Sequence, residues 1–175
     1  EAILGELSLG IDRVADRNSM LCHWDNGYEK IAGRFQRYAL RVNWDYCEVN
    51  PFAETTGNYI DAVEWICRYL EHALEACRLS DPPQVSWGSA MVADRFRKNV
   101  DLILTDPPYY DAIPYADLSD FFYIWLRRVL YDRFPKELAT RVTQKEEELI
   151  QHAARGGGNH TSAKQWYENG MADAF

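Results

Sequence analysis

Apolar residues recur at helical spacing in several stretches of the first half of the chain. One stretch begins at about residue 3 and stops at Asn18-Ser19, and another covers about 29–42. The clearest covers about 58–78, where these residues make one apolar stripe: Tyr59, Ile60, Val63, Ile66, Cys67, Leu70, Ala73 and Leu74. Residues 43–57 are rich in Asn, Pro, Thr and Gly, which predicts a loop. We therefore expect a helical lead region over residues 1–83.

The chain changes character after Ser80-Asp81-Pro82-Pro83, because neither proline can continue a helix. Gln84 to Trp87 predicts a short strand, and Met91 to Arg97 predicts a short helix. Val100 to Thr105 is a compact, mostly apolar run of strand length, which is typical of a strand buried on both faces of a parallel sheet. Residues 84–175 therefore predict an α/β region that contains part of a parallel sheet.

Two further helices are predicted beyond this strand. An amphipathic helix is expected over about 118–130, with Asp117 or Ser119 as its cap. A charged helix is expected over about 136–154, and its charge run indicates a solvated face. Gly156 to Asn159 predicts a flexible loop. Because this loop follows a helical segment and not a strand, we do not expect it to bind phosphate.

The composition places the chain of 175 residues in the ordinary globular range, with 47% hydrophobic and 26% charged residues. No stretch approaches the roughly 18 apolar residues that a membrane span requires, and no signal-peptide pattern opens the sequence. The four cysteines form no CxxC pair, and only His23 lies near one of them, so no metal site is predicted. The cysteines indicate reduced, buried thiols in a cytoplasmic protein. The lack of an apolar span predicts that the protein does not engage a membrane.

The net charge of -8 limits the ways in which this chain can bind nucleic acid. A protein that binds DNA mainly through its phosphates is usually basic, so any DNA contact here is expected to be local. The sequence opens on Glu1, in what reads as the middle of a helix. We therefore expect a piece of a longer protein, whose remaining segments would be partners of this one.

The most specific motif is Asp106-Pro107-Pro108-Tyr109, which follows the predicted strand. Open α/β sheets place ligand sites at the carboxyl ends of their strands. The residue types suit methylation of an exocyclic amino group, because the Asp106 carboxylate and the Pro107 carbonyl are two acceptors for the two N–H groups of an amine. The two prolines fix the loop in advance. The ring of Tyr109 offers a flat face for a base flipped out of its helix.

A family resemblance follows from these residues. Val100 to Tyr109, VDLILTDPPY, resembles motif IV of the amino methyltransferases that act on adenine N6 or cytosine N4. Residues 87–90, WGSA, resemble the strand end at which many of these enzymes contact the adenine of S-adenosylmethionine. The wider chain resembles large adenine-specific DNA methylase-like proteins of bacteria and archaea, in four stretches: DRVADRNSMLCHW (12–24), LRVNWDYCEVNPF (40–52), LTDPPYYDAIPYADLSDFFYIWLRR (104–128) and YENGMADAF (167–175).

This resemblance implies a partial Rossmann-like methyltransferase fold over residues 84–175 and an S-adenosylmethionine-dependent DNA methyltransferase that favours adenine N6. Asp106 and Pro107 would hold the amine, Pro108 would shape the turn, and Tyr109, together with Tyr110, would contact the base. Three consecutive residues would border the cofactor: Gly88, Ser89 and Ala90. Ser89 departs from the acidic residue that is common at that turn. No FxGxG-like loop occurs in the sequence, so we expect this chain to be inactive by itself.

Other interpretations of the motif stay open. The same acceptors would serve an RNA base or a protein glutamine amide. The motif is also compatible with a structural turn, or with a non-catalytic scaffold whose Pro107-Pro108-Tyr109-Tyr110 matches the PPxY ligand of WW domains. That ligand requires an accessible polyproline II segment, whereas the sequence ties this one to a hydrophobic strand.

Overall fold

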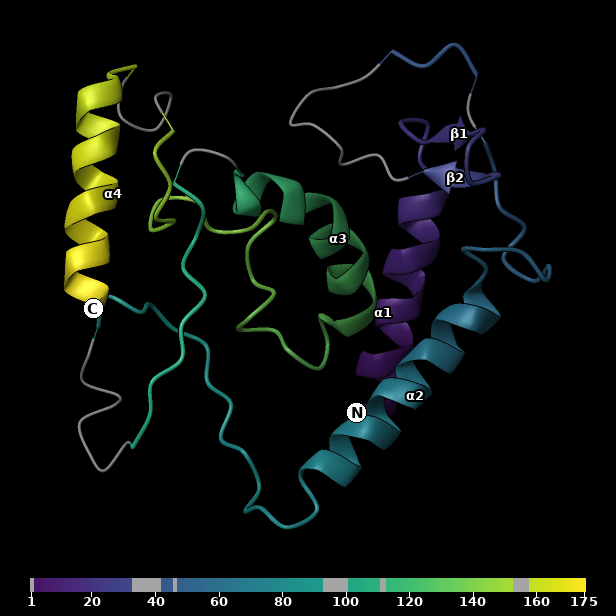
Figure 1. Ribbon diagram of the computed structural model, residues 1–175, viewed down its shortest axis with the longest axis horizontal. Helices are drawn as coiled ribbons and strands as arrows, with labels where there is room; N and C mark the ends of the chain where they lie inside the picture. The colour runs from purple at the N-terminus through teal and green to yellow at the C-terminus, as the bar shows by residue number, and fades with distance from the viewer. Residues whose placement is uncertain (1, 33–41, 46, 93–100, 111–112, 153–157) are drawn as a thin grey trace. The chain divides into compact units, whose positions relative to one another are not determined.

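The computed structural model describes residues 2–32, 42–45, 47–92, 101–110, 113–152 and 158–175 (Figure 1). Its elements are α1 (Ala2–Arg17), β1 (His23–Asp25), β2 (Lys30–Ala32), α2 (Tyr59–Ala76), α3 (Tyr115–Leu130) and α4 (His160–Ala174). The chain divides into two units: Glu1–Pro82 with Leu118–Thr143, and Pro83–Asp117 with Gln144–Phe175. Among the described residues, no helix combines the length and the apolar character needed to cross a membrane.

Helices α1 and α2 of the first unit pack against each other, and the sequence predicted both (Figure 1). The amide of Asn18 donates to the Val14 carbonyl at 3.0 Å, just after α1 ends. The side chain of Asn58 caps α2 by accepting a 2.7 Å hydrogen bond from the N–H of Asp61. No residue of the predicted apolar stripe is fully buried, and the one buried residue of α2 is Ala62, which lies outside that stripe.

The strands β1 and β2 form an antiparallel hairpin in which Trp24 pairs with Ile31. The carboxylate of Asp25 closes its turn by accepting from the N–H of Gly27 at 2.9 Å. Ile31 packs with Cys22 and Val49 in a small buried core. The helix predicted over 29–42 is therefore wrong at residues 30–32, and residues 33–41 lie outside the described part of the chain.

The second unit departs further from the sequence analysis. Residues 84–87 and 101–105 form no strand, so both strand predictions are wrong there, and Val100 lies outside the described residues. Three apolar side chains of the second run are 70–85% exposed: Leu102, Ile103 and Leu104. A strand buried on both faces needs neighbouring strands, and the described residues supply none beside this run. The Rossmann-like fold therefore stays a prediction.

Helix α3 was predicted, but it begins at Tyr115. Asp117 and Ser119 therefore lie inside the helix, and their assignment as its cap is wrong. The next segment folds back along α3, with Asp120 accepting from the backbone and the hydroxyl of Thr143 at 2.7 and 2.6 Å. The charged helix predicted over 136–154 does not form at residues 136–152, and residues 153–154 lie outside the described part.

The other predictions have mixed outcomes. Residues 43–57 form the expected loop wherever they are described. Met91 and Val92 are not helical, and residues 93–97 of that predicted helix lie outside the described residues. None of the four cysteines, all of which are described, forms a disulfide. Only Cys22 is buried, and Cys67 and Cys77 are exposed on or next to α2. Helix α4 was not predicted. It begins after Asn159, whose side chain accepts from the N–H of Thr161 at 2.9 Å.

Candidate functional site

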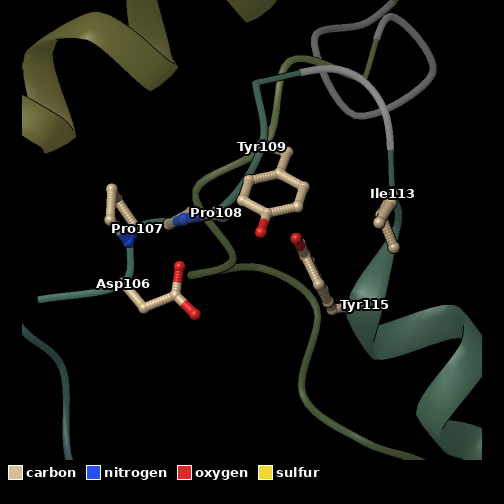
Figure 2. A pocket seen from close by; sticks show the side chains of 6 residues that line it. All are labelled: Asp106, Pro107, Pro108, Tyr109, Ile113 and Tyr115. Atoms are coloured by element: carbon tan, nitrogen blue, oxygen red, sulfur yellow. The ribbon is translucent and has the colours of Figure 1, made fainter.

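The Asp106–Tyr109 loop borders an open hollow of about 370 Å³ within the second unit (Figure 2). All four residues of the predicted catalytic motif line it, and the remaining lining residues are Ile113 and Tyr115. The loop ends an exposed, extended segment that runs from residue 101. Asp106 and Pro107 are exposed and Pro108 is half-buried. The structure thus brings the motif residues together at a surface that a ligand can reach.

The two predicted acceptors are exposed and are not used by other described residues. Among the residues that the structure describes, neither the Asp106 carboxylate nor the Pro107 carbonyl has a hydrogen-bond partner. The next carbonyl, that of Pro108, is engaged twice: it accepts from the Tyr167 hydroxyl at 3.0 Å and from the N–H of Tyr110 at 3.0 Å. The loop therefore offers the Asp106 carboxylate and the Pro107 carbonyl to a ligand, whereas the Pro108 carbonyl is already used within the protein.

Two tyrosines form the aromatic walls of the hollow. Tyr109 is 60% exposed, and Tyr115, the first residue of α3, is 37% exposed. Figure 2 shows their hydroxyl groups pointing toward one another. The sequence analysis did not assign Tyr115 to the site. Its position directly after Pro114 is a signal that could have been used, since proline favours helix starts and would place this tyrosine in the first turn, near the loop.

Tyr110, which the resemblance assigned to the base, does not line the hollow. Its ring lies edge-on to the ring of Tyr167, with centroids 4.5 Å apart, and its hydroxyl donates to Glu168 at 3.4 Å. Partial burial, together with the negative charge of Glu168, raises the pKa of the Tyr110 hydroxyl. The structure therefore places Tyr110 against α4, and its contact with a substrate stays a prediction that this geometry does not support.

The backbone of Tyr110 explains this turn away from the hollow. Its φ of 44° lies in the left-handed region, which non-glycine residues adopt rarely and at a cost of about 1–2 kcal/mol. Contacts on several sides hold it there, because its N–H donates to Pro108 and its carbonyl accepts from the N–H of Gln151 at 2.9 Å. The chain reverses sharply at the end of the motif, so Tyr109 and Tyr110 face different surroundings.

The predicted cofactor residues lie elsewhere in the same unit. Gly88, Ser89 and Ala90 follow an extended stretch and do not line the hollow. The hydroxyl of Ser89 accepts from the N–H of Met91 at 3.3 Å, which is a local turn contact. Nothing in the described part of the chain tests the contact of these three residues with S-adenosylmethionine, which stays a prediction. Within the same described residues, no group of three His, Cys, Asp or Glu side chains is arranged to hold a metal ion.

Comparisons with known proteins add no family. No family model matches this chain, and neither a curated protein nor a solved structure matches it. The resemblance to amino methyltransferases therefore depends on the sequence motifs alone.

Proposed function

We propose that this chain carries the amine-binding loop of an S-adenosylmethionine-dependent DNA methyltransferase that acts on an exocyclic amino group, with adenine N6 favoured. The observation that carries the proposal is the pair of acceptors on Asp106 and Pro107, which have no hydrogen-bond partner among the described residues and lie at the edge of a hollow with aromatic walls. We place the protein in the cytoplasm as part of the same proposal, because none of its four described cysteines forms a disulfide.

The chemistry of an exocyclic amine explains why two acceptors are needed. The nitrogen lone pair of adenine or cytosine is delocalised into the ring, so the amine is a poor nucleophile. If the Asp106 carboxylate and the Pro107 carbonyl each accept one N–H, the amine is held in one orientation and its lone pair can be directed toward a methyl donor. The hydrogen bond to the carboxylate is the stronger of the two, because its acceptor is charged.

The aromatic walls provide the second half of base recognition. A base must leave the stack before its amino group can reach this loop, and an unstacked base requires a new surface for its face. The exposed ring of Tyr109 provides that surface beside Asp106, and stacking on an aromatic side chain contributes about 1–3 kcal/mol per base. The methyl donor supplies the transferred group, and the residues described here act only on the acceptor.

The decisive experiment is methyl transfer from labelled S-adenosylmethionine to DNA by the full-length protein, followed by digestion and identification of the modified nucleoside. We expect N6-methyladenine in the wild type and a loss of at least about 100-fold in Asp106→Ala, as when a preorganised hydrogen-bonding group is removed. Asp101→Ala is the matched control, because Asp101 is also an exposed aspartate in the same extended segment but does not line the hollow.

Unchanged transfer in Asp106→Ala would contradict the proposal. RNA and a glutamine-containing peptide, added as competitors in the same assay, distinguish the other substrates that this acceptor pair would serve. Stronger competition by either one than by unlabelled DNA would change the substrate class but keep the role of the loop.

One observation also favours the WW-domain ligand, because Pro107 is exposed and no sheet among the described residues covers its segment. Tyr110 opposes it, since the φ of 44° is far from the polyproline II value of about -75° and its ring packs on α4. Titration of the full-length protein with a WW domain tests this alternative, and we expect no binding.

A further inference from the structure

Helix α4 and the segment before it hold the Asp106–Tyr109 loop at several points. The hydroxyl of Tyr167 donates to the Pro108 carbonyl at 3.0 Å, and its ring packs edge-on against Tyr110. The N–H of Gln151 donates to the Tyr110 carbonyl at 2.9 Å. Tyr167 and Gln151, which are distant in the sequence, thus hold the end of this loop opposite the exposed Asp106 carboxylate.

The same preceding segment also reaches the other wall of the hollow. The carboxylate of Glu148 accepts a 2.8 Å hydrogen bond from the N–H of Ala116, in the first turn of α3 and next to Tyr115. The Trp166 indole of α4 donates to the Glu148 carbonyl at 3.4 Å. The loop, the start of α3 and α4 are therefore connected through residues 148–151.

The hydrogen bond from the Tyr167 hydroxyl determines which carbonyl of the loop can accept from a ligand, because it occupies the carbonyl of Pro108. A carbonyl oxygen has two lone pairs. On Pro108 these are taken by the Tyr167 hydroxyl and by the N–H of Tyr110. The carbonyl of Pro107, one residue earlier, has no partner in the described part of the chain. Of the two proline carbonyls, only that of Pro107 is left to accept a hydrogen bond from a ligand.

We propose that Tyr167 is a positioning residue that selects the Pro107 carbonyl as the second acceptor of the target amine. It does so by occupying the Pro108 carbonyl and by fixing the loop that carries Asp106 and Pro107 at the edge of the hollow. This inference rests on the proposed function. It assigns a role to α4, which carries none of the predicted site residues and which the sequence analysis did not predict as a helix.

Tyr167→Phe tests this role, because phenylalanine keeps the ring that packs on Tyr110 and removes only the donor. We expect kcat for methyl transfer to fall about three- to tenfold, as for the loss of one hydrogen bond, with the KM for DNA changed less than about twofold. Hydrogen exchange at the Tyr110 amide should become faster, since its carbonyl acceptor loses the second donor that held it in place.

Tyr123→Phe is the matched control. The Tyr123 hydroxyl also donates to a backbone carbonyl, that of Thr140 at 2.8 Å, but it belongs to the first unit and makes no hydrogen bond to the described residues of the loop. This variant should keep kcat and the exchange rate of the Tyr110 amide at their wild-type values.

The outcomes separate this inference from the proposed function. If the wild-type protein transfers methyl groups and Tyr167→Phe does so at the same rate, the role of Tyr167 is wrong while the function stands. If the wild type transfers none, the function fails and the selection of an acceptor fails with it. Unchanged exchange at Tyr110 in Tyr167→Phe would show that the loop is fixed without this hydroxyl, and would overturn the inference whatever the activity.

Discussion

The ring of Tyr59 lies directly against the backbone of Gly10. A Cβ atom built on Gly10 would lie 2.9 Å from Cε2 of Tyr59, closer than real Cβ contacts are found. Gly10 is buried in α1, and Tyr59 is the first residue of α2. The absence of a side chain at this position therefore lets the two helices approach each other. Gly5, earlier in the same helix, has no atom within 4 Å of its built Cβ.

This pair of glycines gives the first prediction. Alanine is favoured over glycine in a helix by about 0.8–1 kcal/mol, so Gly5→Ala should stabilise the protein by roughly that amount. Gly10→Ala should lose the gain and fall about 1–3 kcal/mol below Gly5→Ala, because the new methyl group pushes the Tyr59 ring. Urea unfolding followed by circular dichroism measures both. Equal stabilisation by the two substitutions would contradict the close packing of α1 and α2.

Asp12 gives a prediction about pH. Its side chain is buried in α1, Oδ1 has no hydrogen-bond partner among the described residues, and burial raises its pKa from 3.8 to about 6. The folded state therefore binds this proton more tightly than the unfolded state. The stability contributed by Asp12 should fall as the pH rises from about 4 to about 6, and should be lowest above that window.

Asp12→Asn removes the titration. The difference in unfolding free energy between Asp12→Asn and the wild type should shift in favour of the variant as the pH rises from 4 to 7. Asp61→Asn is a suitable control for a carboxylate on the neighbouring helix. A pH-independent difference between Asp12→Asn and the wild type would show that this carboxylate is not buried as described.

The two tyrosine walls give a prediction about DNA binding. Tyr109→Ala should weaken the binding of DNA whose target base is flipped out by about 10- to 100-fold, because the substitution removes the ring on which the base stacks. Tyr109→Phe should keep most of the affinity, since the ring stays. Tyr69→Ala, which removes another exposed tyrosine on α2, serves as the control. Fluorescence anisotropy of a labelled oligonucleotide measures the effect, and equal losses in Tyr109→Ala and Tyr109→Phe would contradict stacking.

Gly170 gives a prediction about the support of the loop. It is buried in α4, and a Cβ atom there would collide with the side chain of Leu149. Gly170→Ala should therefore destabilise the protein by about 1–3 kcal/mol. It should also speed hydrogen exchange at the Tyr110 amide, because α4 carries Tyr167. Asn169→Ala, at an exposed position beside it, should be neutral or slightly stabilising. Equal thermal midpoints for the two variants would contradict the prediction.

The helices α1, α2 and α3 could be predicted because each has an apolar stripe long enough to show its period. Helix α4 has a weaker signal, since its buried positions are the small residues Ala163 and Gly170. The charged segment 136–152 has the composition of a helix. Its contacts instead follow α3, through Thr143 on Asp120 and through Leu138, whose carbonyl accepts from Arg127. Such long-range hydrogen bonds leave no periodic pattern in the sequence.

The sequence predicted the residues of the candidate site better than the secondary structure around them. Asp106 to Tyr109 do line one hollow, but the strand expected before them is not formed. Strand propensity describes how a segment fits beside partners, and the sequence of the run cannot reveal whether partners are present. The orientation of Tyr110 was missed for a similar reason, because it depends on Tyr167 and Gln151, which are distant in sequence.

The exposed run Leu102-Ile103-Leu104 has a consequence for the behaviour of the protein in concentrated solution. Extended apolar segments without a paired neighbour are templates for intermolecular β-aggregation, and flanking charges and prolines oppose it. Here the flanking residues are Asp101 on one side and Asp106-Pro107-Pro108 on the other. The residues that we assign to amine recognition then also protect the apolar run from aggregation. Replacing the charge at Asp106 or at Asp101 should therefore lower the solubility of the protein.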